Sequence, residues 1–167
     1  FASIFILTAL SMIFMQTGNL SYDAVGSFLL SGVASSQKMM IYFSAILLIS
    51  AFAIKTGAVP FHSWLPDAHQ SADTAISVLL SGIVIKIAGV YSLIVLTRLF
   101  SGLKAVHVTL AAIGILSVVT GALLAAKQNH FKRIIAYSSV SQMGYILLGL
   151  STGTTLGLIG AVAHVFS

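Results

Sequence analysis

The 167-residue sequence contains no cysteine, no glutamate, only two prolines and a single tryptophan. Charged side chains make up 7% of it, whereas soluble domains usually contain about 25%. The absence of cysteine excludes thiolate metal sites and leaves the redox compartment undetermined. The scarcity of charge excludes an ordinary soluble domain. The absence of glutamate means that any carboxylate acting within this sequence must be one of three aspartates.

Hydrophobic residues make up 58% of the sequence, which is typical of a multi-pass membrane protein. The net charge is +5, but the basic residues are mostly dispersed, so we expect membrane flanks and no nucleic-acid surface. The sequence begins and ends inside apolar runs, and no signal peptide is visible. We therefore expect residues 1–167 to be a single membrane-embedded fragment of a longer protein.

Six apolar runs predict an all-α polytopic fold with about six transmembrane helices, because open sheet edges cannot be satisfied in lipid. Residues 16–38 are polar and small, and predict a connecting loop that can hold a short helix. Basic residues divide three against three between the two membrane faces, so the positive-inside rule does not give the orientation. The runs cover residues 2–15, 38–54, 75–97, 105–126, 132–150 and 154 onward.

The second run is interrupted in "AIKTGAVPFHSWLPDAHQ", residues 53–70. Pro60 and Pro66 disrupt helical hydrogen bonding, and Gly57 weakens the helix further. A discontinuous membrane helix is typical of a cavity or an ion site. The alternative is that Lys55 extends to the membrane surface and an ordinary loop follows it.

Lys86 lies near the middle of the third run, too deep for its ammonium to reach the surface comfortably. A central lysine costs about 2.5–3.5 kcal/mol on insertion, so we expect it to face protein or water. Gly82 and Gly89 lie on its stripe and predict close approach of another helix. Lys86 is then either a proton or ion site, or a structural donor to neighbouring carbonyls. Its counter-ion lies among Asp67 and Asp73 or outside the sequence.

Other polar residues form a supporting set. Ser138, Gln142 and Tyr145 follow i, i+4, i+7 spacing and predict one helical stripe, which either carries water or bonds neighbouring helices. His164 stands in the last run, where it either relays protons or bonds a backbone carbonyl.

The interrupted stretch adds His62, Asp67 and His69 to the supporting polar path. Their spacing matches no common metal motif, and we expect no metal site. No flavin, nicotinamide or phosphate-binding fingerprint is present either, so we expect no cofactor in this chain.

Three motifs occur in order: "KTGAVPFHSWLPDAH", "SVLLSGIVIKIAGVY" and "KRIIAYSSVSQMGYILLG". Together they resemble the proton-antiporter-like membrane subunit family over residues 39–167. This family includes pumping subunits of respiratory complex I, of membrane-bound hydrogenases and of multisubunit sodium/proton antiporters. Two departures concern helix ends: Asp73 replaces an apolar residue or proline, and His130 replaces an acid.

The resemblance implies a fold of about fourteen helices with two inverted five-helix repeats, of which this sequence holds the end of the first and the start of the second. It implies that Lys55, Lys86 and His164 belong to a proton relay, with Lys55 at a flexible break. It also implies a glutamate partner for Lys55 on a helix preceding Phe1.

The function that we expect is a proton-translocating subunit of a redox-driven complex, without redox chemistry of its own. Partner membrane subunits are expected to carry any iron–sulfur clusters, flavin or quinone. One alternative is a subunit of a sodium/proton antiporter, and another is a structural subunit with inert lysines. The expected location is a prokaryotic cytoplasmic membrane, with the mitochondrial inner membrane or another energy-transducing membrane as alternatives.

Overall fold

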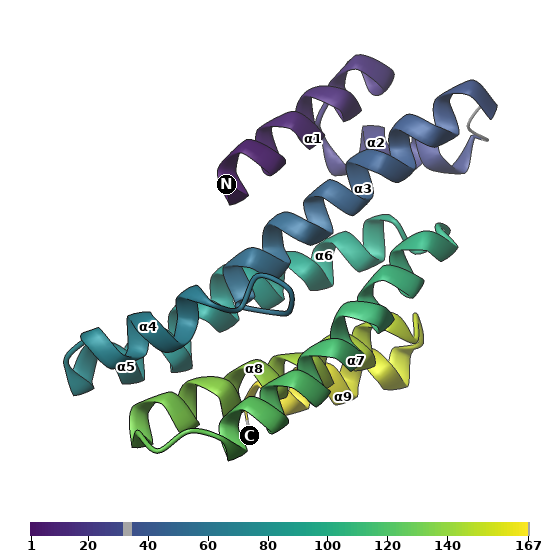
Figure 1. The fold of residues 1–167 in the computed structure, drawn as a ribbon. Helices are drawn as coiled ribbons and strands as arrows, with labels where there is room; N and C mark the ends of the chain where they lie inside the picture. The colour runs from purple at the N-terminus through teal and green to yellow at the C-terminus, as the bar shows by residue number, and fades with distance from the viewer. Residues whose placement is uncertain (32–34, 167) are drawn as a thin grey trace.

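The computed structural model describes residues 1–31 and 35–166, and within them the chain is helical without strands (Figure 1). The helices come from the predicted apolar runs, and four segments are long and apolar enough to cross a membrane: Gln37–Thr56, Thr74–Leu99, Lys104–Ala126 and Phe131–Ser151. Their lengths of 20, 26, 23 and 21 residues meet the roughly 20 residues that a bilayer core requires. The elements are α1 (Ala2–Thr17), α2 (Tyr22–Leu30), α3 (Ser35–Thr56), α4 (Trp64–Ser71), α5 (Thr74–Leu79), the π-helical turns η1 (Leu80–Val84) and η2 (Lys86–Tyr91), α6 (Ser92–Leu99), α7 (Lys104–Ala126), α8 (Phe131–Ser151) and α9 (Thr155–Phe166).

The first and last apolar runs form shorter helices. α1 has 16 residues, and it is followed after a short break by α2, which is bent from it by 61°. α9 has 12 residues. The short helix expected in the first loop is α2, whose N-terminus is capped by the Ser21 hydroxyl accepting from the Ala24 amide at 3.3 Å.

α7 and α8 pack closely along their length, and Figure 1 shows them beside α9 at one side of the fold. Glycine makes this approach feasible. A Cβ added at Gly121 would lie 2.7 Å from the backbone nitrogen of Ser141, and one at Gly144 would lie 2.7 Å from the carbonyl oxygen of Gly114. Small residues at the contact are how membrane helices gain van der Waals packing in the absence of a strong hydrophobic drive.

The break in the second run begins where predicted, at Gly57. Its φ of 68° lies in the left-handed region that suits glycine. The Gly57 amide donates to the carbonyl of Ile54 at 3.2 Å, and the Ala58 amide donates to the carbonyl of Ala53 at 2.9 Å. This pair of bonds is a Schellman motif, so α3 ends with a defined cap.

The residues after this cap are tied to other parts of the fold. The Val59 amide donates to the hydroxyl of buried Ser117 on α7 at 3.0 Å. The Trp64 indole N–H donates to the carbonyl of Ile54 at 3.0 Å, which joins the start of α4 to the end of α3. The break is therefore a connection whose first three amides, those of Gly57, Ala58 and Val59, have protein partners.

Candidate functional site

Lys55 lies in the last turn of α3, directly before the cap. Its ammonium is 5.6 Å from the centroid of the Phe52 ring. It lines a cavity of about 460 Å³ whose other walls are apolar or aromatic: Ile54, Trp64, Leu80, Val84, Ile85 and Ala88. The cavity therefore places Lys55 against the π-helical part of the third span.

Lys86 is the first residue of η2 and is half-buried. Its ammonium donates to the carbonyl of Val165 on α9. The side chain therefore reaches from the third span to the last helix, next to His164. This contact is compatible with a relay, and it is also the carbonyl contact expected of a structural lysine.

The segments that carry the two lysines touch each other at Gly89. A Cβ added there would meet the Thr56 Cγ2 atom at 2.2 Å, so the close approach requires glycine. Thr56 follows Lys55 directly, and Gly89 lies one turn after Lys86. Gly82, predicted to be a second contact on this stripe, has no atom within 4 Å of its built Cβ among the described residues. The prediction of close approach is therefore confirmed at Gly89 and wrong at Gly82.

The backbone around Lys86 is π-helical, with η1 and η2 separated by Ile85. The Ile85 amide donates to the carbonyl of Leu80, five residues earlier. π-helical turns widen the helix and are frequent at functional sites, because they shift the direction of the side chains that follow. Residue type did not predict them, since the apolar pattern of the run suits an α-helix equally well.

His164 lies beside two members of the predicted stripe on α8. Its Nε2 atom donates to the Gln142 Oε1 atom at 2.6 Å, and its ring packs edge-on to Tyr145 at 5.8 Å between centroids. No contact of this kind joins Ser138 to the cluster within the described residues. The neighbouring Ser139 instead bonds Ser81 at 3.2 Å between hydroxyl oxygens.

His62 and His69 are placed by the break and by α4. The His62 ring lies 6.1 Å from that of Tyr137 on α8. His69 is buried, and its Nδ1 atom is 2.5 Å from the Ser77 hydroxyl of α5. Within the described part of the chain, His62 Nδ1 and His69 Nε2 are buried without a hydrogen-bond partner. His69, Ser77, Ser81 and Lys132 line one cavity of about 390 Å³.

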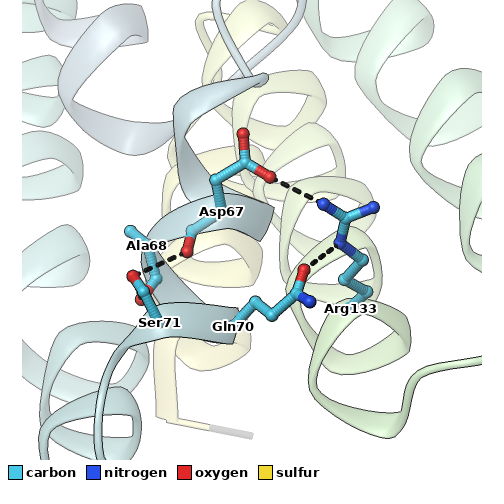
Figure 2. A network of polar contacts seen from close by, with 5 residues as sticks. All are labelled: Asp67, Ala68, Gln70, Ser71 and Arg133. Atoms are coloured by element: carbon cyan, nitrogen blue, oxygen red, sulfur yellow. Dashed lines mark hydrogen bonds and ion pairs between the residues drawn. The ribbon is translucent and has the colours of Figure 1, made fainter.

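Asp67 forms an ion pair with Arg133 at 2.9 Å, as Figure 2 shows. The guanidinium also donates from Nε to Gln70 Oε1 at 2.5 Å, so α4 is joined to the start of α8 by two side-chain contacts. Lys132 adds a bond to the carbonyl of Ala72 at 2.7 Å. Asp67 is therefore paired with an arginine, and it does not contact either candidate lysine.

The predicted residues thus lie in two regions, and Ser138 contacts neither of them within the described residues. Lys55, Lys86 and His164 gather around the third span and α9, with Gln142 and Tyr145 beside them. His62, Asp67 and His69 lie near α4 and the start of α8. Sequence reasoning missed Ser77, Ser81 and Ser139, since the residue type alone does not show which serines of a helix face a neighbouring helix.

No group of three or more His, Cys, Asp or Glu side chains within residues 1–31 and 35–166 is arranged to hold a metal ion. The groups available in the two clusters are ammonium, imidazole, carboxylate, hydroxyl and amide groups. These groups can hold, donate and accept protons.

Comparison with known proteins gives one consistent result. Residues 1–167 match the family described as NADH:quinone oxidoreductase/Mrp antiporter, TM. The chain is 40% identical to NAD(P)H-quinone oxidoreductase chain 4 1 of a Synechococcus species, over 99% of this chain and 33% of the relative. It is 36% identical to NADH-quinone oxidoreductase subunit M of Rickettsia prowazekii, over 100% of this chain and 33% of the relative. The chain therefore spans about a third of the length of these curated relatives.

Two solved structures are similar in fold. A chain of the Mrp complex from Dietzia superposes with a TM-score of 0.86 at 27% identity, over 98% of this chain and 30% of that chain. A chain of an archaeal membrane-bound sulfane sulfur reductase superposes with a TM-score of 0.83 at 32% identity, over 99% and 34% respectively.

Proposed function

Because the chain belongs to the NADH:quinone oxidoreductase/Mrp antiporter transmembrane family, we propose that it is part of a proton-translocating membrane subunit of a redox-driven complex. The main supporting observation is that the segments of Lys55 and Lys86 touch next to a helix break. Lys86 also reaches α9, the helix that contains His164. The curated relatives are quinone oxidoreductase chains, which supports the redox-driven form of the proposal. In the full subunit, this chain would supply the end of one inverted repeat and the start of the next.

Lys55 would hold a proton at the end of α3. Its side chain lines a cavity whose other walls are apolar or aromatic. Neither Asp67, which is paired with Arg133, nor any other described side chain forms an ion pair with Lys55. A carboxylate from the remainder of the subunit would then set how firmly the proton is held.

Lys86 would pass the proton toward α9. Its ammonium bonds the carbonyl of Val165, which follows His164 directly in α9. His164 is oriented by its Nε2 bond to Gln142 and by its contact with Tyr145. The second cluster, with His62, Asp67 and His69, would support this path from α4, but it has no direct contact with the lysines.

The partners of the chain would be other membrane subunits of a multisubunit complex and the surrounding lipid. Reducing equivalents would be handled by those partners, where any iron–sulfur clusters, flavin or quinone would be bound. The residues described contain ammonium, imidazole and hydroxyl groups suited to proton transfer, which is the task left to this chain.

A sodium/proton antiporter subunit is the second candidate. It is favoured by the similarity to a chain of the Mrp complex, with a TM-score of 0.86. The same lysines would serve this function, but an ion gradient would replace electron transfer as the driving force. A structural subunit with inert lysines is the third candidate, and the bond from Lys86 to a backbone carbonyl is the observation that it would explain.

The test uses the complete complex in sealed vesicles, with proton uptake and electron transfer measured together. We expect Lys55→Met and Lys86→Met to abolish most of the pumping and slow electron transfer while the complex still assembles. Lys104→Met, which removes a charge at a helix end, is the control and should pump normally. Normal pumping in both relay variants would leave the lysines with a structural role. Transport that needs a sodium gradient and no electron donor would favour the antiporter.

A further inference from the structure

Two cavities adjoin at one end of the first helices. The larger, with a volume of about 500 Å³, is lined by two cations, Lys38 and Arg98. Its remaining lining residues come from α2, from the start of α3 and from the connection between α6 and α7. We refer to it as the headgroup cavity.

Both cations lie at the ends of membrane spans. Lys38 is in the first turn of the span Gln37–Thr56, and Arg98 is in the last turn of the span Thr74–Leu99. Because they line one cavity, these two span ends lie at the same face of the membrane. That is the depth at which the phosphates of lipid headgroups are found.

The charge of the headgroup cavity is uncompensated within the described chain. Neither Lys38 nor Arg98 forms an ion pair there, since the recorded pair is that of Asp67 with Arg133. No aspartate lines the cavity, while Tyr42 and Ser101 add polar groups to its wall. An exposed lysine and arginine facing one hollow are suited to a phosphate, and the guanidinium can bind two of its oxygens at once.

The second cavity, of about 270 Å³, is a mainly apolar groove between α1, α2, α3 and α6. Leu99 lines both cavities, and Val25 of the groove is followed by Gly26 of the headgroup cavity, so the two cavities adjoin at these residues. The groove is lined along the spans by side chains such as Ile6, Leu48 and Val95. A cavity lined by two cations therefore adjoins an apolar groove along the spans.

We propose that these two cavities form a binding site for one anionic phospholipid. Its phosphodiester lies between Lys38 and Arg98, and an acyl chain lies in the apolar groove. The charge pair selects an anion, and the groove selects an acyl chain over a free phosphate. A zwitterionic lipid carries a cationic group that meets no carboxylate in this cavity, so it binds less tightly.

The experiment uses the full-length subunit in its complex, reconstituted into phosphatidylcholine bilayers with increasing phosphatidylglycerol. Native mass spectrometry counts the lipid molecules that remain bound to the subunit. We expect Lys38→Gln/Arg98→Gln to weaken phosphatidylglycerol binding about 25-fold, since one basic side chain near an anionic headgroup contributes about fivefold. The control is Lys104→Gln/Lys127→Gln, which removes the same charge outside the cavities and should leave this binding almost unchanged.

A second variant tests the site without changing charge. Gly26 lines the headgroup cavity, and a Cβ there would have only ordinary contact with Leu99 at 4.0 Å, so the backbone tolerates a side chain. Gly26→Leu should fill part of the junction and displace the lipid, while the complex assembles normally by size-exclusion chromatography.

Three results would overturn the proposal. The first is equal retention of phosphatidylglycerol in the wild type and in the charge variant. The second is no preference for phosphatidylglycerol over phosphatidylcholine in the wild type, as expected if a helix of the longer subunit fills the groove. The third is equal competition by inorganic phosphate, which would make the site one for a free anion.

Discussion

Replacing Gly89 by alanine tests how closely the two lysine-bearing segments must approach. The added Cβ would lie 2.2 Å from Thr56 Cγ2, 3.3 Å from Thr56 Cβ and 3.4 Å from its backbone nitrogen. Thr56 is buried and β-branched, and its hydroxyl donates to the carbonyl of Ala53 at 3.0 Å, so its side chain cannot easily rotate away. The two segments must therefore separate.

The magnitude follows from the packing. Overpacking in a closely packed interior costs about 1–3 kcal/mol. This cost is partly offset by the better helix propensity of alanine, which contributes about 0.5–1 kcal/mol. We expect a net destabilisation of up to about 2.5 kcal/mol, together with a displacement of Lys86 relative to Lys55 that reduces pumping.

The same span provides a matched control. Gly82→Ala makes the same substitution seven residues earlier, where nothing lies within 4 Å of the new Cβ among the described residues. It should be neutral or slightly stabilising and should leave pumping unchanged. Thr56→Ser removes the Cγ2 atom while keeping the hydroxyl, so the double variant Gly89→Ala/Thr56→Ser should recover most of the lost stability.

The assays are thermal unfolding of the purified complex and proton uptake in sealed vesicles. A coupling energy of about 1 kcal/mol or more between Gly89→Ala and Thr56→Ser would place the clash at this contact. The reasoning would be refuted if Gly89→Ala and Gly82→Ala behaved alike, or if Thr56→Ser left the Gly89→Ala defect unchanged.

Other substitutions test the remaining contacts. Ser117→Ala should destabilise the complex by about 1–3 kcal/mol in thermal unfolding, because it leaves the buried Val59 amide without its acceptor; unchanged stability would show that water replaces the hydroxyl. Gln142→Leu should slow pumping because the imidazole loses the amide that orients it, whereas Ser138→Ala on the same stripe should pump normally; equal rates in both would argue against a role for this bond. Arg133→Gln should cost only about 1 kcal/mol or less in thermal unfolding, because the two partners of its ion pair are 35% and 72% exposed; a much larger loss would mean that the pair is buried in the complete complex.

The helices could be predicted from the sequence with good accuracy because each crossing needs about 20 apolar residues. The fourth and fifth runs, residues 105–126 and 132–150, differ from α7 and α8 by only one residue at any end. The break at Gly57 was also predictable, since glycine and proline disrupt a helix through their own backbone properties.

Other features depended on contacts that local patterns do not contain. The π-helical turns beside Lys86 have the same apolar periodicity as an α-helix, and the 61° angle between α1 and α2 is not contained in the apolar pattern of the two helices. The contact of Ser139 with Ser81, in place of one from Ser138, depends on the rotation of α8 about its axis. Arg133 meets Asp67 across 66 positions of the sequence, a separation at which residue spacing carries no information.

The tied connection after α3 changes how a discontinuous helix can respond to charge. A break of this kind could act as a hinge, but here the end of α3 is capped, and the Val59 amide donates to a hydroxyl of α7. α7 in turn packs closely against α8 at glycine residues. These contacts hold the backbone of the break in a fixed position. When the charge near Lys55 changes, we expect its side chain to change conformation and nearby protons to move, while the backbone of the helix stays in place.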